Sequence, residues 1–173
     1  MPDHLMDGEA ALDLITTLTE NGVDVCVSGG WAVDALLGEQ TRPHGDLDLW
    51  LPAVQFEQAV VTFVRTGVDR LFPWGDDRPW NFVLHDGAQR RVDLHLYETL
   101  TDGTLHYGGI ETGETFPPNA LQGHGTIGTQ PVRCETSTWS VRWHTGYTPR
   151  PSDHRDVERL CAKFNLELPA EFR

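Results

Sequence analysis

Residues 28–51 read SGGWAVDALLGEQTRPHGDLDLWL, and this stretch decides which fold the chain adopts. Gly29 and Gly30 open a short helix that a later glycine ends, and Asp46 and Asp48 then stand one residue apart on an apolar strand. Glycine lets the backbone turn sharply and approach a ligand closely, and the free N–H groups of a helix start bind anions. The stretch therefore predicts a phosphate site beside a pair of carboxylates.

A third carboxylate lies on a second alternating segment, RVDLHLY, at residues 91–97. Side chains alternate along a strand, so Asp46, Asp48 and Trp50 share one face and the leucines between them share the other. The same alternation places Asp93 opposite the apolar face of its own strand. If both apolar faces point into one core, the three aspartates meet at one sheet edge. Oxygen ligands select a hard ion such as Mg²⁺, and such a triad can hold two ions for displacement at phosphorus.

Several groups beside the aspartates are candidates for binding a nucleotide: Ser28, Gly29, Gly30, Arg42 and His44. The first three offer a hydroxyl and backbone N–H groups, which form an electropositive nest for phosphates. The planar guanidinium of Arg42 matches the oxygens of a triphosphate. The alternative for Arg42 is a surface ion pair with Glu39 or Asp46.

Six blocks of the chain resemble, in order and spacing, the small antibiotic nucleotidyltransferases: GGWAVDALLG, TRPHGDLDL, VDLHLY, PVRC, HTGY and DHRDVERL. The lincosamide enzymes are the most similar, followed by the aminoglycoside 2″-nucleotidyltransferases, within the superfamily that includes DNA polymerase beta. The resemblance implies an α+β nucleotidyltransferase fold, with a mixed twisted sheet, flanking helices and a short C-terminal helical segment. It also implies metal and catalytic roles for Asp46, Asp48 and Asp93, two Mg²⁺ ions, and a nucleoside triphosphate such as ATP as co-substrate.

The expected reaction is transfer of a nucleoside monophosphate to a hydroxyl of a small antibiotic, with release of pyrophosphate. Asp93 is the candidate general base, because it need only accept a proton from a hydroxyl whose pKa the metal has lowered. The favoured acceptor is a lincosamide, and an aminoglycoside is the alternative. A component of a toxin–antitoxin pair that modifies a protein is the alternative from a different class.

Five residues are further candidates for contact with the substrate: His95, His144, Tyr147, Asp153 and Asp156. His95 shares a face with Asp93 and either orients a carboxylate, touches the acceptor, or is structural. The two aspartates lie in the first turn of a helix expected from near Asp153, where negative charge suits the helix dipole. Their alternative is therefore an N-cap at Asp153 with Asp156 as its reciprocal partner.

The composition limits the classes of partner. The chain has 173 residues, 13 Lys+Arg and 26 Asp+Glu, which gives a formal net charge of −13. Such a chain repels nucleic acid and attracts a cationic small molecule, although the acidity is also explained by solubility alone. We expect one cytoplasmic domain over 1–173 with no membrane span, its sheet and helices in 1–130 and its helical segment in 131–173. A homodimer is an open alternative.

The remaining patterns predict a half-buried strand over 23–27 and amphipathic helices over 11–18, from Pro52 to Thr66, and over 138–144. The second helix carries an expected core stripe of Phe56, Val60, Phe63 and Val64. Asp86 and Gly87 predict a hairpin that joins strands at 80–85 and 90–97. An earlier strand, 70–74, is expected before a loop that contains Gly75, Asp76 and Asp77.

The segment from Thr99 to Gln130 is rich in Gly, Thr and Pro. It predicts a long irregular connection, with one hairpin near 105–110, that walls the acceptor pocket. The three cysteines are Cys26, Cys134 and Cys161, and they lack the spacing of a zinc site or a disulfide framework. We expect buried thiols.

Overall fold

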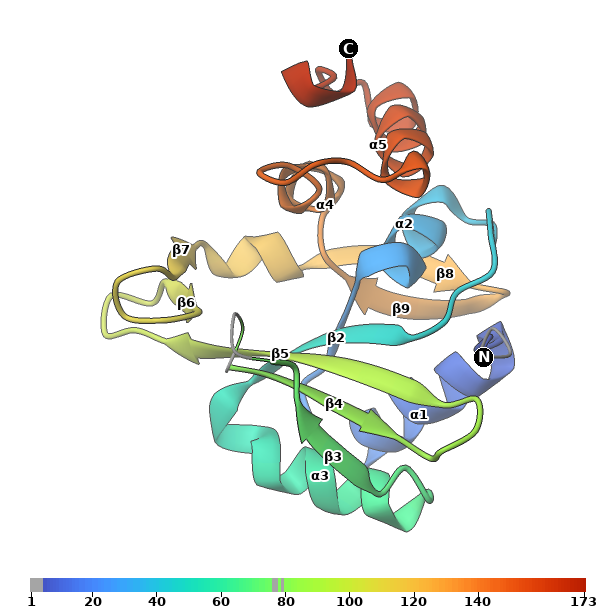
Figure 1. The fold of residues 1–173 in the computed structure, drawn as a ribbon, viewed down its shortest axis with the longest axis vertical. Helices are drawn as coiled ribbons and strands as arrows, with labels where there is room; N and C mark the ends of the chain where they lie inside the picture. The colour runs from blue at the N-terminus through green and yellow to red at the C-terminus, as the bar shows by residue number, and fades with distance from the viewer. Residues whose placement is uncertain (1–4, 76–77, 79) are drawn as a thin grey trace.

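A mixed β-sheet organises the chain (Figure 1). The structure is a computed structural model that describes residues 5–75, 78 and 80–173, so the expected Asp76–Asp77 loop lies outside the described residues. The strands are β1 (Cys26–Ser28), β2 (Leu47–Pro52), β3 (Arg70–Pro73), β4 (Asn81–His85), β5 (Arg91–Thr99), β6 (Leu105–Tyr107), β7 (Glu114–Phe116), β8 (Gly123–Ile127) and β9 (Gln130–Cys134). Their order is β3-β4-β5-β2-β1-β9-β8, and β6 extends from β5 to pair with β7.

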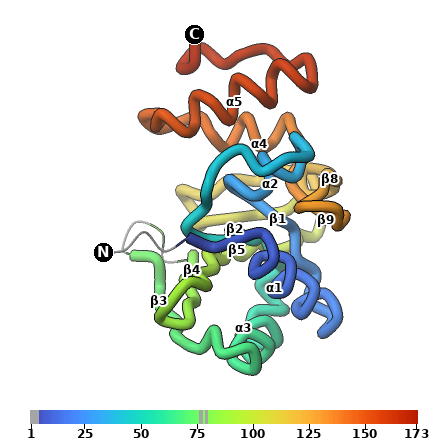
Figure 2. The backbone as a smooth tube through the Cα atoms, turned by 90° about the vertical axis from the view of Figure 1, so that its right-hand side faces the viewer, coloured from blue at the N-terminus to red at the C-terminus, as the bar shows by residue number. Residues whose placement is uncertain are grey.

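Helices flank this sheet on both sides (Figures 1 and 2). They are α1 (Gly8–Glu20), α2 (Gly29–Leu37), α3 (Phe56–Arg65), α4 (Ser137–Trp143) and α5 (Pro151–Phe164), with 3₁₀ turns at Ala53–Gln55, Pro118–Leu121 and Ala170–Phe172. Figure 2 shows α1 and α3 at one end of the molecule and α4 and α5 stacked beyond α2 at the other. None of the helices among the described residues has the length and apolar character needed to cross a membrane. The expected α+β fold is confirmed.

The two faces of the sheet bury different side chains. Leu47, Leu49 and Leu51 of β2 belong to the main core, while Trp50 packs into a smaller cluster on the other face. Strand β5 repeats this division, because its apolar positions join the main core and Tyr97 joins the smaller cluster. The alternation read from the sequence therefore describes both strands correctly.

Two local predictions are corrected by packing. The 23–27 strand is not half-buried: β1 begins only at Cys26, and all three of its residues are buried because the sheet is covered on both faces there. In α3, Phe63 is buried but Val64 is 50% exposed, and the inner positions belong to Ala59 and Thr62. The helix presents a narrower apolar face than the sequence suggested.

The segment expected to be irregular contains sheet strands. The hairpin near 105–110 exists as β6 and β7, but β8 also lies in the main sheet and pairs with β9. The sequence of β8, GHGTI, lacks apolar alternation because α2 packs directly on it: a Cβ on Gly125 would lie 2.3 Å from the backbone of Ala35. The C-terminal helical segment was predicted over 131–173. It begins only at Ser137, because the residues before it form β9. The cysteines are free and buried, as expected.

Candidate active site

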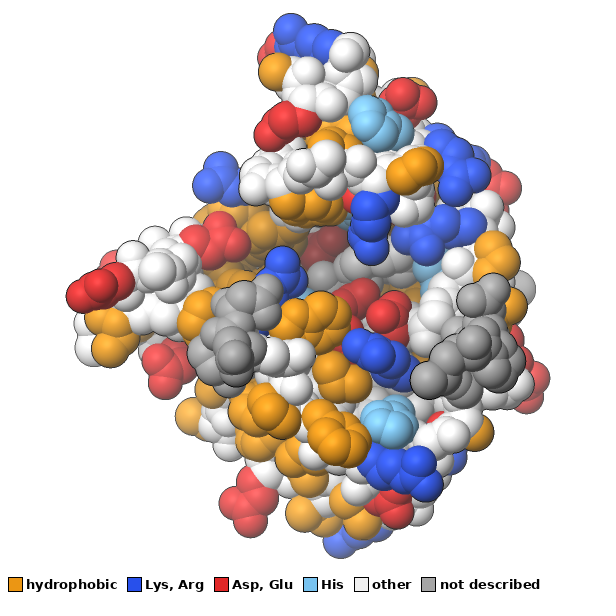
Figure 3. All heavy atoms as spheres, in the orientation of Figure 1, with side chains coloured by type: hydrophobic (Ala, Val, Ile, Leu, Met, Phe, Trp, Pro, Cys, Tyr) orange, Lys and Arg blue, Asp and Glu red, His pale blue; other side chains and the backbone are white. Residues whose placement is uncertain are grey.

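The sheet brings the predicted carboxylates together. Asp48 on β2 lies beside Asp93 on the parallel strand β5, and Ser28 at the end of β1 is the neighbour of Asp48 on its other side. Asp46 immediately precedes β2. Figure 3 shows acidic side chains gathered in a hollow near the middle of the face in view, with basic side chains around it. The predicted pairing of the two aspartate strands is confirmed.

Burial and mutual repulsion act on these carboxylates. Burial, followed by the charges of Asp48 and Asp93, raises the pKa of Asp46 to about 6. Burial and the charge of Asp48 also raise the pKa of Asp93, although hydrogen bonds from Arg91 oppose this. A carboxylate whose pKa is raised in this way is stabilised by any added cation.

Arg91 supplies the nearest positive charge, and it was not among the site residues predicted from the sequence. Its Nε lies 3.1 Å from Oδ1 of Asp93, its Nη2 lies 3.4 Å from Oδ2, and Nε is 4.0 Å from Oδ2 of Asp46. In this arrangement, the described residues include no group of three or more His, Cys, Asp or Glu side chains placed to hold a metal ion. The sequence signal was the position of Arg91, two residues before Asp93 on the same strand face.

His95 contacts a carboxylate, which is one of the roles expected for it. Its Nε2 lies 3.1 Å from Oδ1 of Asp48, and its Nδ1 lies 3.2 Å from Nδ2 of Asn81. Asn81 in turn accepts a hydrogen bond from the hydroxyl of Tyr107 at 2.7 Å, which directs its amide N–H toward Nδ1. Because Nδ1 then accepts, Nε2 carries the hydrogen that it donates to Asp48. His95 orients Asp48.

The two glycines of the helix start are required by close contacts. Gly29 has φ of +60°, and a Cβ there would lie 2.3 Å from Oδ2 of Asp48. A Cβ on Gly30 would lie 2.5 Å from Nδ1 of His44 and 2.7 Å from Nη2 of Arg42. The start of α2 therefore lies against a carboxylate, an imidazole and a guanidinium, and a side chain at either glycine would displace them.

Arg42 and His44 are fixed by acidic partners. Arg42 pairs with Asp156 of α5 at 3.0 Å, and not with Glu39 or Asp46 as the alternative proposed. Its Nη1 lies 3.1 Å from Nδ1 of His44. His44 is buried, with Nε2 bonded to Asp34, so its ring faces protein groups on both sides. Arg42, which is partly exposed, is the member of this pair that remains open to a ligand.

The two acidic residues of α5, Asp153 and Asp156, bind different partners. The expected N-cap at Asp153 is wrong, because α5 begins at Pro151 with Arg150 as N-cap, and proline suits the first helical position. Asp153 is buried and accepts hydrogen bonds from Arg150 N at 2.8 Å and from its guanidinium. Asp156 is not its reciprocal partner, since its carboxylate binds Arg42.

The remaining two candidates lie between α4 and α5. His144 is buried at the end of α4 and donates from Nδ1 to the carbonyl of Ser140 at 2.7 Å. Tyr147 is 43% exposed, and burial together with the charge of Asp153 raises its pKa. Both residues belong to the segment that connects α4 to α5.

Glu135 carries a buried carboxyl group and was not among the site residues predicted from the sequence. It follows β9, is 1% exposed, and accepts hydrogen bonds from Ser28 Oγ at 2.7 Å and Trp50 Nε1 at 3.3 Å. The hydroxyl of Ser28, expected to face phosphates, therefore gives its hydrogen to Glu135. Burial raises the pKa of Glu135, although Ser28 and His144 oppose the shift. No local pattern marks this residue.

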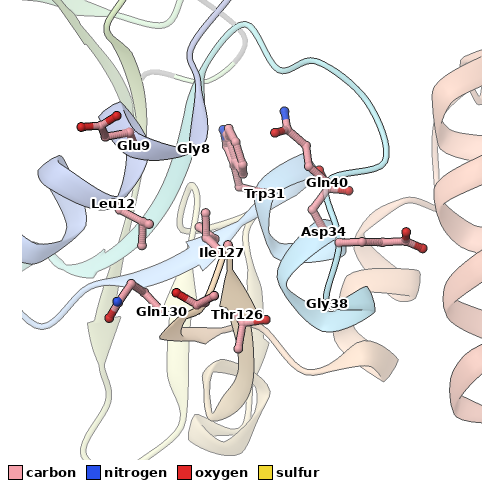
Figure 4. A pocket seen from close by; sticks show the side chains of 13 residues that line it. Gly8, Glu9, Leu12, Trp31, Asp34, Gly38, Gln40, Thr126, Ile127 and Gln130 are labelled. Carbon is pink, nitrogen blue, oxygen red and sulfur yellow. The ribbon is translucent and has the colours of Figure 1, made fainter.

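An aromatic cluster borders the carboxylates. Trp50 packs against His95 with ring centroids 5.1 Å apart, and against Tyr107 and Trp143 at 4.7 and 4.9 Å. A cavity of about 360 Å³ adjoins this cluster and is lined by Glu114, Arg142, Trp143 and Thr145. A second cavity, of about 420 Å³, lies between α1, α2 and the β8–β9 turn and is shown in Figure 4. Neither cavity is lined by the three aspartates.

The arrangement of strands and helices is that of a nucleotidyltransferase, as solved structures show. The chain superposes on lincosamide antibiotic adenylyltransferase LnuA, solved with lincomycin, with a TM-score of 0.77 and 21% identity, covering 90% of this chain and 97% of that one. It superposes on ANT(2″)-Ia in complex with adenylyl-2″-tobramycin with a TM-score of 0.70 and 19% identity, covering 91% and 88%.

Sequence comparison identifies the family. The chain is 24% identical over 134 residues to a lincosamide resistance protein of Staphylococcus haemolyticus, covering 78% of this chain and 81% of that protein. It is 27% identical over 173 residues to a 2″-aminoglycoside nucleotidyltransferase of Escherichia coli, covering 92% and 91%. The model of the aminoglycoside-2″-adenylyltransferase family matches residues 11–160. The chain belongs to this family.

Replacement of Gly29 by alanine tests the close contact at the helix start. Gly38→Ala is the matched control, because Gly38 also has positive φ, +80°, but a Cβ there meets nothing within 4 Å. We expect the control to lose about 1 kcal/mol from backbone strain, and Gly29→Ala to lose roughly 2–4 kcal/mol because the clash with Asp48 adds to that strain. Urea unfolding measures both losses, and equal losses would contradict the contact.

Replacement of Glu135 by glutamine tests its raised pKa. Below the ordinary value of 4.5 the carboxyl is protonated in both the folded and unfolded states, so its contribution is fully present. As the pH rises, the unfolded state ionises first, and the contribution is lost as the pH passes through the higher folded pKa. We therefore expect the stability of Glu135→Gln relative to the wild type to increase as the pH rises above 4.5, as measured by urea unfolding. A relative loss over this range would disprove the raised pKa.

Proposed function

We propose that this protein transfers a nucleoside monophosphate from a nucleoside triphosphate to a hydroxyl of a small antibiotic and releases pyrophosphate. The observation that carries the proposal is the row formed by Asp48 and Asp93 beside the glycine-opened start of α2. Family membership and the antibiotic-modifying relatives support the same reaction. They favour it over a toxin–antitoxin component.

The carboxylates suit a hard divalent cation. Asp46, Asp48 and Asp93 offer oxygen ligands only, their repulsion contributes to the raised pKa of Asp46, and one guanidinium, that of Arg91, lies against them. We propose that these three residues hold Mg²⁺, with two ions in the complete complex. When bound, Mg²⁺ neutralises charge on the triphosphate and lowers the pKa of the acceptor hydroxyl.

The protein groups position the reactants and move the proton. The backbone N–H groups at Gly29 and Gly30 bind phosphate oxygens at the start of α2, and Arg42 adds a positive charge beside them. His95 holds Asp48 in place through the bond from Nε2. A carboxylate oxygen of Asp93 takes the proton from the acceptor hydroxyl as that hydroxyl attacks the α-phosphorus.

The acceptor lies on the aromatic side of the carboxylates. The cavity beside Trp143 combines an indole surface with the carboxylate of Glu114, and Trp143 Nε1 donates to that carboxylate at 2.8 Å. Aromatic faces and acidic groups suit a drug that carries both an apolar body and an amine. A lincosamide fits this description, and the lincosamide-named relatives support it. An aminoglycoside is the second candidate, favoured by the family description and by the net charge of −13.

An acceptor assay separates these candidates. The purified protein is incubated with labelled triphosphate, Mg²⁺ and either lincomycin or kanamycin, and pyrophosphate release is followed. We expect release that depends on lincomycin, because the aromatic cavity favours a drug with an apolar body. Release with kanamycin alone would assign the aminoglycoside reaction, and label transferred to protein without either drug would refute an antibiotic acceptor.

Single substitutions separate the roles of the aspartates. Asp93→Asn should lower turnover by about 10²-fold or more, because positioned proton transfer contributes about 10²–10⁴-fold, while nucleotide binding persists. Asp48→Asn should weaken Mg²⁺-dependent nucleotide binding in calorimetry. Asp13→Asn, on the exposed side of α1, is the control and should match the wild type. Activity of Asp93→Asn within about tenfold of the wild type would exclude Asp93 as the base.

A further inference from the structure

Arg91 occupies the position where a cation is needed. It begins β5 on the same face as Asp93, and its guanidinium covers both carboxylate oxygens of Asp93 while it reaches toward Asp46. The Asp93 carboxylate is 5% exposed and the Arg91 side chain 42% exposed, so the arginine covers the acid from the solvent side. The oxygens that a metal would use are thus already bonded.

We propose that Arg91 is an internal counter-ion that occupies the carboxylates in the metal-free protein and competes with a divalent cation for them. The inference rests on the proposed function, in which Asp46, Asp48 and Asp93 are the metal ligands. Two positive groups bound to the same carboxylate oxygens repel each other strongly, so occupancy by one weakens the other. A bidentate guanidinium must therefore leave Asp93 before that carboxylate ligates an ion.

A second contact lowers the free-energy cost of moving the Arg91 guanidinium away from the carboxylates. The guanidinium carbon of Arg91 lies 5.7 Å from the ring centroid of Trp74, which is itself 40% exposed. An aromatic face stabilises a guanidinium at this distance, and the aliphatic stem of arginine packs on apolar surface. Arg91 therefore retains a partner at the rim of the site after it leaves the carboxylates.

Competition of this kind has a functional consequence. In the metal-free protein Arg91 partly neutralises the Asp93 carboxylate, so a free ion gains less from binding than it would at a bare triad. An ion that arrives with a triphosphate brings anionic phosphate oxygens, and these oxygens balance the positive charges of the ion and of the released guanidinium. Uptake of the metal is therefore coupled to binding of the nucleotide.

Binding of Mn²⁺ to the nucleotide-free protein tests the proposal. Calorimetry compares the wild type with Arg91→Met, which keeps the stem and removes the charge. Arg90→Met is the matched control, because Arg90 is the neighbour in sequence but pairs with Asp86 at 2.9 Å in the hairpin turn. We expect Arg91→Met to bind Mn²⁺ about tenfold more tightly than the wild type, within the usual range of coupling between sites, and Arg90→Met to bind as the wild type does.

Thermal unfolding provides a readout that does not depend on activity. With chelator present, Arg91→Met should melt below the wild type because its carboxylates lack a counter-ion, and Mn²⁺ should raise its Tm by more than it raises that of the wild type. Arg91→Gln replaces the methionine variant if that variant fails to fold.

The outcomes separate this inference from the proposed function. Equal or weaker Mn²⁺ binding by Arg91→Met overturns the role of Arg91 alone, if Asp48→Asn still weakens metal-dependent triphosphate binding in the wild-type background. If Asp48→Asn leaves Mn²⁺ binding unchanged in both the wild-type and Arg91→Met backgrounds, the aspartates are not the ligands, and the proposed metal role fails.

Discussion

The site depends on two like charges held side by side by a sheet. Parallel pairing sets Asp48 of β2 beside Asp93 of β5, and carboxylates in such positions destabilise the pairing by up to about 1 kcal/mol. Burial of leucine side chains on the opposite faces of these strands outweighs this cost. Leu47, Leu49 and Leu94 are fully buried there, and each buried leucine contributes roughly 1.5–3 kcal/mol. The main core therefore holds the two carboxylates together against their electrostatic repulsion.

Neighbouring groups regulate that repulsion without removing it. Arg91 neutralises Asp93 in part, His95 orients Asp48, and Glu135 ties Ser28 to Trp50 behind them. The C-terminal helix is fastened over the same region by charge. Asp156 binds Arg42, Arg159 binds Glu39, and Lys163 donates to the carbonyl of Leu37 at 2.8 Å, so α5 is attached at three points to α2 and the loop after it. This attachment holds α5 beside α2 (Figure 1).

Local patterns predicted the elements whose own residues specify them. The helix after Gly29 and the two aspartate strands were predicted correctly because turn chemistry and alternation act over a few positions. Strand β8 was not predicted because its GHGTI sequence lacks apolar alternation. Its glycine at position 125 is required by the close approach of α2, which lies far from β8 in the chain. The N-cap of α5 was displaced for a different reason: Arg150 caps through Asp153, and arginine is not a usual N-cap residue.

The sequence by itself determined that three aspartates share one side of the sheet and that a glycine-opened helix starts beside them. Apolar alternation leaves those strands one orientation that buries their leucines. Only the tertiary structure decided which charges meet. Ser28 and Glu135 lie 107 positions apart, and Arg42 and Asp156 lie 114 apart, so no local periodicity relates them. Such pairs form because packing excludes water from Glu135 and from Asp156, and a buried polar group without a partner costs about 1–3 kcal/mol.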